Sequence, residues 1–213
     1  MGMGLDKIII RPAQPKDAPA AARLMYYSGP NYMLAFFSQT EDKAIAVLRK
    51  MFPLPRHAES YTYAFVAQDE GNVVGAFSGF NGKSLRCANR VSRMYGPVWL
   101  VALPPWQIPR MIAAFNDFNT AVPPVLDEEY YVMHFAVLPD RQGQGIGKQL
   151  MEFAEGQART KGLKRLTLDV ELDNEGARRF YKRSGFQAIK VVTDLAYCKR
   201  FGFRGSIRMV KPV

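Results

Sequence analysis

A strand-like run that leads through a glycine-rich loop into a helix constrains this 213-residue chain more than any other stretch. The apolar run from Met133 to Leu138 stops at Pro139, glycines follow at positions 143, 145 and 147, and an amphipathic pattern begins at Ile146. The first amides of a helix have no partner within the helix, and the helix dipole makes that end positive. Glycines let the backbone approach a phosphate closely. The stretch from His134 to Gly147 therefore predicts a site for a phosphorylated ligand.

Two common phosphate-binding motifs do not fit this loop. In the nucleotide-hydrolase motif G-x-x-x-x-G-K-[ST], the first glycine would fall on Gln142 and the hydroxyl residue on Gln149. In the dinucleotide motif G-x-G-x-x-G, the third glycine would fall on Lys148. The pattern that does fit is Q-x-x-G-x-G, which starts at Gln142.

A second motif follows downstream. The segment from Asn174 to Phe186 matches N-x-x-A-x-x-[FL]-Y-x-x-x-G-F at Asn174, Ala177, Phe180, Tyr181, Gly185 and Phe186. With both motifs, and with a predicted helix and strand of fitting length between them, the chain resembles the GNAT-type acyl-CoA-dependent N-acyltransferase superfamily. The resemblance covers residues 130–189 and is silent on residues 82–129 and on the tail, residues 199–213.

The resemblance implies acetyl-CoA as the cofactor. In the family, the loop amides hold the pyrophosphate of coenzyme A, and the preceding strand pairs with the pantetheine arm. The cofactor contacts implied here come from Phe135, Ala136, Val137, Gln142, Gly143, Gln144, Gly145, Ile146, Gly147, Lys148 and Asn174. Asn174 also has a simpler interpretation as a helix cap, and both roles are compatible.

Tyr181 and Asp169 are the candidate catalytic residues. The resemblance implies that Tyr181 lies near the cofactor sulfur and protonates the leaving thiolate; the alternative is an aromatic that only packs on the pantetheine arm. An attacking amine is protonated at neutral pH, so a base or a water chain must remove a proton. Asp169 lies on the polar face of a predicted strand where some members carry a base, and Glu171 shares that face. The alternative for Asp169 is a solvated or salt-bridged carboxylate. His134, in the predicted cofactor strand, is a further candidate base, and its alternative is a hydrogen-bonded core residue.

We predict one domain over residues 1–213, of the α/β (α+β) class, with a mixed central sheet that is flanked by helices and splayed near Pro139 to admit the cofactor. Apolar patterns and turn residues predict a helix capped by Asp17, another capped by Thr40, and a late-starting helix over 106–118. Further helices follow Gly145 and Asn174. The predicted strands span residues 7–11, 61–68, 73–80, 91–100, 130–138, 164–172 and 186–192.

The implied reaction moves an acetyl group from acetyl-CoA to a primary amine by direct attack in a ternary complex. The acceptor is a small molecule or a protein amine, and the sequence identifies neither it nor the general base. No metal is expected, because Cys87 and Cys198 match no metal-ligand spacing. We expect a monomer or homodimer.

Charge suggests an alternative function. The formal net charge of +10 suits an anionic cofactor, an acidic substrate or nucleic acid. The alternative is a basic non-catalytic module that binds nucleic acid or a ribosomal surface through the tail, which has five basic residues and no acidic one, and through the basic residues at 178–183. The intact glycine loop favours the enzyme. The two cysteines form no disulfide framework, which indicates a reducing, cytoplasmic compartment. No apolar run approaches the ~20 residues of a membrane span, and the charged N-terminal segment is unlike a secretory signal.

Overall fold

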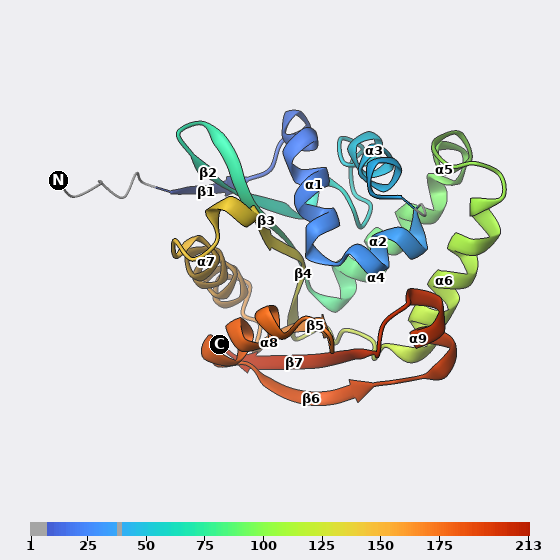
Figure 1. The fold of residues 1–213 in the computed structure, drawn as a ribbon. Helices are drawn as coiled ribbons and strands as arrows, with labels where there is room; N and C mark the ends of the chain where they lie inside the picture. The colour runs from blue at the N-terminus through green and yellow to red at the C-terminus, as the bar shows by residue number, and fades with distance from the viewer. Residues whose placement is uncertain (1–7, 38–39) are drawn as a thin grey trace.

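Seven strands form one mixed sheet in the order β1-β2-β3-β4-β5-β7-β6 in the computed structural model, which describes residues 8–37 and 40–213 (Figure 1). All neighbouring strands are antiparallel except β4 and β5. The strands are β1 (Ile9–Pro12), β2 (Ala64–Asp69), β3 (Asn72–Phe80), β4 (Glu129–Val137), β5 (Arg165–Glu171), β6 (Gln187–Val192) and β7 (Ser206–Pro212). The helices are α1 (Ala18–Ser28), α2 (Pro30–Phe36), α3 (Glu41–Met51), α4 (Gly82–Met94), α5 (Gly96–Ala102), α6 (Gln107–Ala121), α7 (Ile146–Thr160), α8 (Glu175–Arg183) and α9 (Leu195–Phe201). This mixed α/β architecture confirms the predicted fold class.

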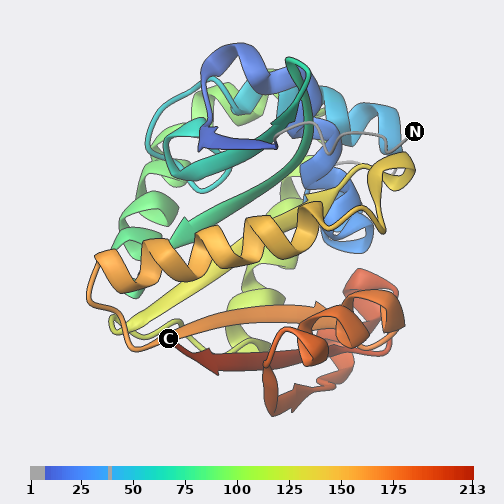
Figure 2. The ribbon, with the colours of Figure 1, turned by 90° about the vertical axis from the view of Figure 1, so that its left-hand side faces the viewer.

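Helices cover both faces of the sheet. In Figure 2, α7 crosses the face nearest the viewer, where its Leu150 packs in one core with Val132 and Leu168 of the strands. On the opposite face, the buried Leu24 of α1 lies in a second core. Because β5 is covered on both sides, its predicted polar face is not solvated, and Thr167 on that face is fully buried.

The N-terminal half follows the sequence pattern with local differences. Helix α2 begins at Pro30, where only a break was predicted, and the strand predicted from residue 61 begins at Ala64, after a 3-10 turn at Tyr61–Tyr63. The hairpin between β2 and β3 forms as predicted, with Glu70 and Gly71 in the turn at positive φ. Asp17 does not cap α1 through its side chain. Its carboxylate instead binds the Arg11 guanidinium at 2.8 Å and accepts a hydrogen bond from the amide of Gln14. The predicted residue Lys7 of the first strand lies outside the described residues.

The expected strand at 91–100 is wrong, because this stretch is helical. Asn81 and Ser84 form a reciprocal capping box, in which each side chain accepts from the other residue's amide, at 2.7 and 2.9 Å. This cap starts α4 at Gly82, and the helix continues into the apolar residues that resembled a strand. Pro97 at the second position of α5 is compatible with a new helix start. Three helices thus occupy most of residues 82–121, between β3 and β4.

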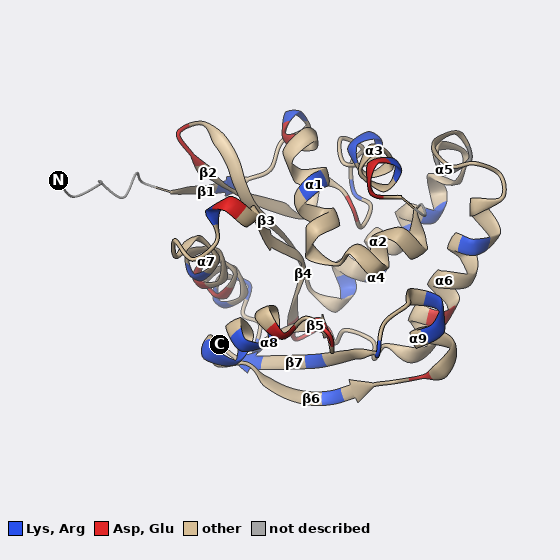
Figure 3. Cartoon of the chain, in the orientation of Figure 1, with Lys and Arg blue, Asp and Glu red and all other residues tan. Residues whose placement is uncertain are grey.

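The basic tail is built into the sheet. β7 pairs with β5 on one side and with β6 on the other. Four of the five tail cations form ion pairs with acidic residues elsewhere: Arg200–Asp117, Arg204–Asp173, Arg208–Asp169 and Lys211–Glu155. Figure 3 shows Lys and Arg distributed over helices and strands along the chain. Among the described residues, no helix has the length and apolar character needed to cross a membrane.

Candidate functional site

β4 and β5 separate along their length and open a gap in the middle of the sheet. Their parallel pairing covers only Glu129–Tyr131 against Arg165–Thr167. Beyond that point β4 continues for six residues and β5 for four without a common register. Phe135, Ala136 and Val137 lie on this separated part of β4, and the last two still pair with β3 on the other edge. The predicted splay is therefore present, and these three residues border it.

A bulge marks β4 at the same level. The β3 register shifts between Ala76, opposite Ala136, and Ser78, opposite Met133, so β4 carries an extra residue. His134 in this bulge has φ +54°, a left-handed conformation that is uncommon for residues other than glycine. The bulge turns the strand where the gap begins.

The glycine loop leads from the end of β4 to the N-terminus of α7. Gly143 and Gly145 have φ of +78° and +81°, and Gly145 is the N-cap residue. The amide of Gln149 donates to the Gly145 carbonyl at 3.1 Å, so the preceding amides of the first turn are left without helical acceptors. The first turn contains no acidic residue. This arrangement suits an anionic group.

Side chains tie the loop to the sheet. Gln142 Nε2 donates to the Val137 carbonyl at 3.1 Å, and the Arg141 guanidinium binds Asp69 of β2 at 2.9 Å. Gln144 donates to the Asp140 carbonyl, and exposed Lys148 lies 3.8 Å from Glu152. The Gln142 side chain thus orients the loop, and Lys148 is accessible beside the helix N-terminus.

Gly147 of α7 lies beside two aromatic rings, with ordinary van der Waals room for a Cβ. A Cβ at this position would lie 3.5 Å from the Phe180 ring and 3.9 Å from Phe135. These two rings stack with centroids 5.7 Å apart. On α8, Asn174 Oδ1 accepts from the Ala177 amide at 3.0 Å, so Asn174 is the predicted helix cap.

Tyr181 is buried on the α7 face of the splay. Its ring packs against Phe135 and Phe186, with centroids 6.1 and 5.8 Å apart. Burial raises the pKa of the Tyr181 hydroxyl above its ordinary value of 10, so the hydroxyl keeps its proton at neutral pH. The described residues provide no hydrogen-bond partner for it, which leaves its proton available to a ligand.

Asp169 is committed to a buried ion pair. Its two carboxylate oxygens bind Arg208 Nε and Nη2 at 2.7 and 2.8 Å, and Tyr131 donates a further hydrogen bond at 3.0 Å. Both charged side chains are almost fully inaccessible. The sequence left open whether Asp169 is a free base or salt-bridged, and the structure places it in a salt bridge. Sequence reasoning missed Arg208, because nothing local connects residues 39 positions apart.

Two other polar side chains on the separated strands each have an atom that lacks a hydrogen-bond partner in the described part of the chain. Glu171 Oε1 on β5 and His134 Nε2 on β4 are inaccessible atoms with no hydrogen-bond partner among the described residues. The alternative given for His134 was a hydrogen-bonded core residue, and its Nε2 has no hydrogen-bond partner in the described part of the chain. Burial lowers the pKa of His134 to about 4, although nearby Glu59 opposes this shift.

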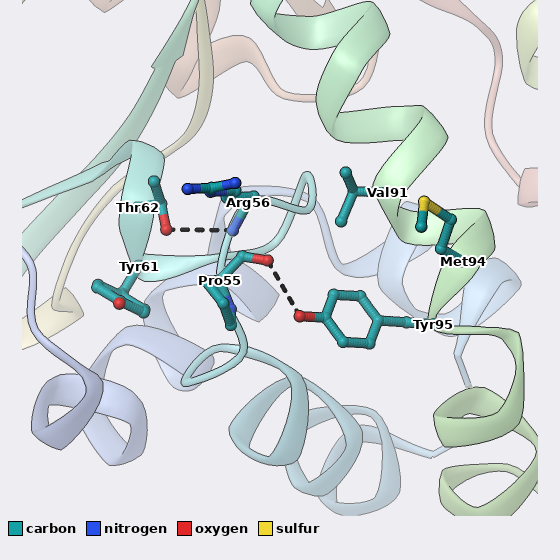
Figure 4. A pocket seen from close by; sticks show the side chains of 7 residues that line it. All are labelled: Pro55, Arg56, Tyr61, Thr62, Val91, Met94 and Tyr95. Atoms are coloured by element: carbon teal, nitrogen blue, oxygen red, sulfur yellow. Dashed lines mark hydrogen bonds between the residues drawn. The ribbon is translucent and has the colours of Figure 1, made fainter.

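An open cavity of about 690 Å³ lies away from the glycine loop (Figure 4). It separates the 55–62 segment from the end of α4, and Tyr95 in its wall donates to the Pro55 carbonyl. No sequence motif maps to its lining: Pro55, Arg56, Tyr61, Thr62, Val91, Met94 and Tyr95. Among the residues that the structure describes, no group of three or more His, Cys, Asp or Glu could hold a metal ion.

A splayed β4–β5 pair followed by a glycine loop and a helix is the arrangement that the resemblance to acyl-CoA-dependent acyltransferases predicts. The sequence model of the acetyltransferase (GNAT) family matches residues 31–186. The chain belongs to this family, whose general reaction is acetyl-CoA-dependent N-acetylation.

Solved structures share the fold over almost the whole chain. An N-acetyltransferase from Staphylococcus aureus Mu50 has a TM-score of 0.68 at 19% identity and covers 95% of this chain and 99% of its own. A PaiA N-acetyltransferase from Thermoplasma acidophilum, solved with coenzyme A, has a TM-score of 0.53 at 13% identity, with coverages of 97% and 99%.

Curated relatives match over shorter segments. The mycothiol acetyltransferase of Rhodococcus jostii is 40% identical over 76 residues, which are 36% of this chain and 23% of the relative. The uncharacterized N-acetyltransferase YycN of Bacillus subtilis is 32% identical over 65 residues, or 30% and 42%. The matches span less than half of each relative, so they do not define the acceptor.

Proposed function

We propose that this chain transfers the acetyl group of acetyl-CoA to a primary amine by direct attack within a ternary complex. The observation that carries the proposal is the placement of the glycine loop and the helix N-terminus of α7 at the mouth of the β4–β5 splay. The loop offers backbone amides to a pyrophosphate, and the splay offers unpaired strand edges to an extended arm. The glycine loop directly follows the exposed edge of β4, so one long anionic thioester could contact both.

Binding would use the residues that border these features. The amides of Gly143, Gly145 and Gly147 would face the pyrophosphate, assisted by the accessible cation of Lys148. Strand groups of Phe135, Ala136 and Val137 would pair with the pantetheine arm. Gln142 would contribute to pyrophosphate binding indirectly, because its side chain holds the glycine loop to β4. Acetyl-CoA supplies the activated acetyl group.

Direct transfer is supported by the location of the cysteines. Cys87 is on α4 and Cys198 on α9, so neither is on β4, β5, α7, α8 or the glycine loop. Orienting two reactants side by side contributes about 7–11 kcal/mol to such reactions. A strand amide near Ala136 would stabilise negative charge on the carbonyl oxygen. The Tyr181 hydroxyl would donate its proton toward the departing sulfur.

The nucleic-acid alternative loses part of its support. Four of the five tail cations are paired and Arg208 is buried, whereas Arg179, Lys182 and Arg183 of α8 are exposed.

Titration calorimetry with acetyl-CoA, compared with a structured RNA of similar total charge, tests the proposed function. We expect saturable one-to-one binding of acetyl-CoA and only weak, salt-sensitive binding of RNA. A screen of primary amines with thiol-release detection then tests transfer. RNA binding that survives 0.2 M salt, with no acetyl-CoA binding, would overturn the proposal.

A further inference from the structure

Unpartnered buried polar atoms gather on the two strands that separate. In the described part of the chain, five buried side chains have a polar atom with no hydrogen-bond partner, and four of them are on β4 and β5: Tyr130 Oη, His134 Nε2, Thr167 Oγ1 and Glu171 Oε1. Native proteins pair nearly all buried polar groups, so such a group of exceptions needs a physical explanation. Tyr130 and Thr167 are in the paired part of the two strands, whereas His134 and Glu171 lie beyond it, where a polar ligand that enters the splay would provide the missing partners.

Glu171 occupies the open end of β5. The strands pair at Tyr131 and Thr167, and Glu171 is four residues further along β5, level with the bulged part of β4. Its side chain is on the sheet face opposite α7, as are Thr167 and Asp169. Asn31 at the start of α2 donates to Glu171 Oε2 at 2.9 Å. Oε1 faces Gly29, where a Cβ would lie 3.9 Å away.

No cation neutralises Glu171 within the described residues. Its charged neighbour Asp173 is paired with Arg204, whose backbone amide also binds Asp173. Arg178 of α8 donates to the Leu172 carbonyl. Tyr197 of α9 and Ser206 of β7 bind each other at 3.1 Å. By contrast, Arg208 fully compensates Asp169, two residues earlier.

The resulting electrostatics favour a cation beside Glu171. Burial is the main cause that raises the pKa of the Glu171 carboxyl above its ordinary value, and Asp173 adds to the increase, whereas the hydrogen bond from Asn31 opposes it. A carboxylate with one satisfied and one unsatisfied oxygen gains most from a ligand that brings both a positive charge and a hydrogen-bond donor.

We propose that Glu171, oriented by Asn31, binds the ammonium group of the acceptor and accepts its proton. This inference rests on the proposed function. Proton transfer from R–NH₃⁺ to Glu171 frees the nitrogen lone pair, which forms the C–N bond as the C–S bond of the thioester breaks. The nitrogen then loses a second proton, and the departing thiolate gains one. The products are the amide and coenzyme A thiol, with the proton on Glu171 released to solvent.

The site therefore selects acceptors that arrive as cations. An alkyl ammonium brings the charge that Glu171 lacks, whereas an arylamine is neutral at pH 7 and brings none. The α7 face holds Tyr181 and the opposite face holds Glu171, so the proton donor and the proton acceptor act from the two sides of the splay.

The experiment compares wild type with Glu171→Gln on n-butylamine, benzylamine, 1,4-diaminobutane and aniline, with saturating acetyl-CoA, from pH 6 to pH 10. We expect benzylamine to be acetylated in preference to aniline. Glu171→Gln should lower kcat/KM for the best amine by about 10²-fold or more at pH 7. As the pH approaches the pKa of the amine, more of the amine in solution is already neutral. The defect in kcat/KM should therefore become smaller.

Matched variants separate this role from a structural one. Glu171→Gln removes an uncompensated buried charge, so its thermal stability should equal or exceed that of wild type. Asp169→Asn instead leaves the Arg208 guanidinium buried without its partner and should lower stability. Glu128→Gln, which changes an exposed carboxylate at the other end of β4, should behave as wild type. Asn31→Ala should move the acidic limb of the pH profile to higher pH, because it removes a hydrogen bond that favours the charged carboxylate.

Several outcomes would overturn the inference. These are equal kcat/KM for Glu171→Gln and wild type, a defect that does not change with pH, or a preference for aniline over benzylamine. Acetyl-CoA binding without turnover, and without thermal stabilisation of that complex by any of the alkylamines, would also overturn it. Failure of acetyl-CoA to bind at all would instead refute the proposed function, so the two failures are distinguishable.

Discussion

Three residues on the splayed strands and α8 differ in chemistry because their environments differ. Asp169 and Glu171 lie two residues apart on one face of β5, yet only Asp169 has an arginine partner. Tyr181 lies among apolar rings on the opposite side of the sheet. The residue types alone indicate acids and bases, but the neighbouring charge and the burial determine which of them is free to react.

At Tyr181, we expect Tyr181→Phe to reduce the chemical step and leave the fold intact. The variant keeps the ring that packs on Phe135 and Phe186 and removes only the hydroxyl. Loss of a proton donor costs about 10²–10⁴ in rate. Single-turnover kinetics should show this loss, with the acetyl-CoA Kd unchanged within a few-fold by calorimetry. Weakened binding in parallel with the rate would identify Tyr181 as a packing residue.

At His134, we expect a pH-dependent effect on stability. Its pKa is about 4 in the folded protein and near its ordinary 6.5 in the unfolded chain. The unfolded state therefore binds more protons, and the free energy of unfolding falls as the pH drops from 6.5 toward 4. The integrated loss is about 3 kcal/mol as an upper estimate.

Thermal unfolding of wild type and His134→Asn between pH 7.5 and pH 4.5 measures this contribution. Asparagine tolerates the left-handed backbone of the bulge and does not titrate. The variant should lose less stability over this range than wild type. Parallel losses in the two proteins would show that His134 protonates freely in the folded state.

At the scale of elements, the loop and α7 together form the proposed anion site. The helix dipole and free amides need an N-terminus without acidic residues, and the loop meets this requirement with positive-φ glycines. The side chains of Gln142 and Arg141 tie the loop to β4 and β2. The site thus depends on the strand that precedes it and on the helix that follows it.

Gly145→Asp and Gly145→Asn form a matched pair that isolates charge at this site. Both residues tolerate a left-handed conformation and have the same size, and open space surrounds the position. We expect the aspartate variant to bind acetyl-CoA at least about tenfold more weakly than the asparagine variant, a difference of about 1.4 kcal/mol. Calorimetry at low and high salt measures both. Equal affinities would place the pyrophosphate elsewhere.

At the scale of the whole molecule, the last strand of the chain lies inside the sheet and not at its edge. β7 is the last strand in sequence but the sixth in spatial order, between β5 and β6. Its buried Arg208 neutralises Asp169, and its Lys211 pairs with Glu155 of α7. The tail therefore supports the wall of the splay and does not serve as a separate basic arm.

Deleting residues 203–213 should abolish folding. The deletion exposes an edge of both β5 and β6 and leaves Asp169 buried without its cation, a loss of about 3–5 kcal/mol for the ion pair alone. Circular dichroism should show no cooperative thermal transition. Lys199→Gln, which removes a tail charge from an exposed position, should unfold as wild type does. A truncated protein with a native-like transition would contradict the role given to β7.

The local elements and the glycine loop could be predicted from the sequence alone. The hairpin turn at Glu70–Gly71, the glycine loop before Ile146 and the Asn174 cap all depend on contacts within a few residues, so local patterns predict them. The helices at 82–102 were missed because an apolar run without clear periodicity fits either a strand or a helix, although the Asn81–Ser84 capping box was a signal in the sequence. The salt bridge of Asp169, the isolation of Glu171 and the position of β7 between β5 and β6 could be seen only in the tertiary structure. Each of them depends on which distant segments lie side by side, and a charge acquires its pKa and its role from those neighbours.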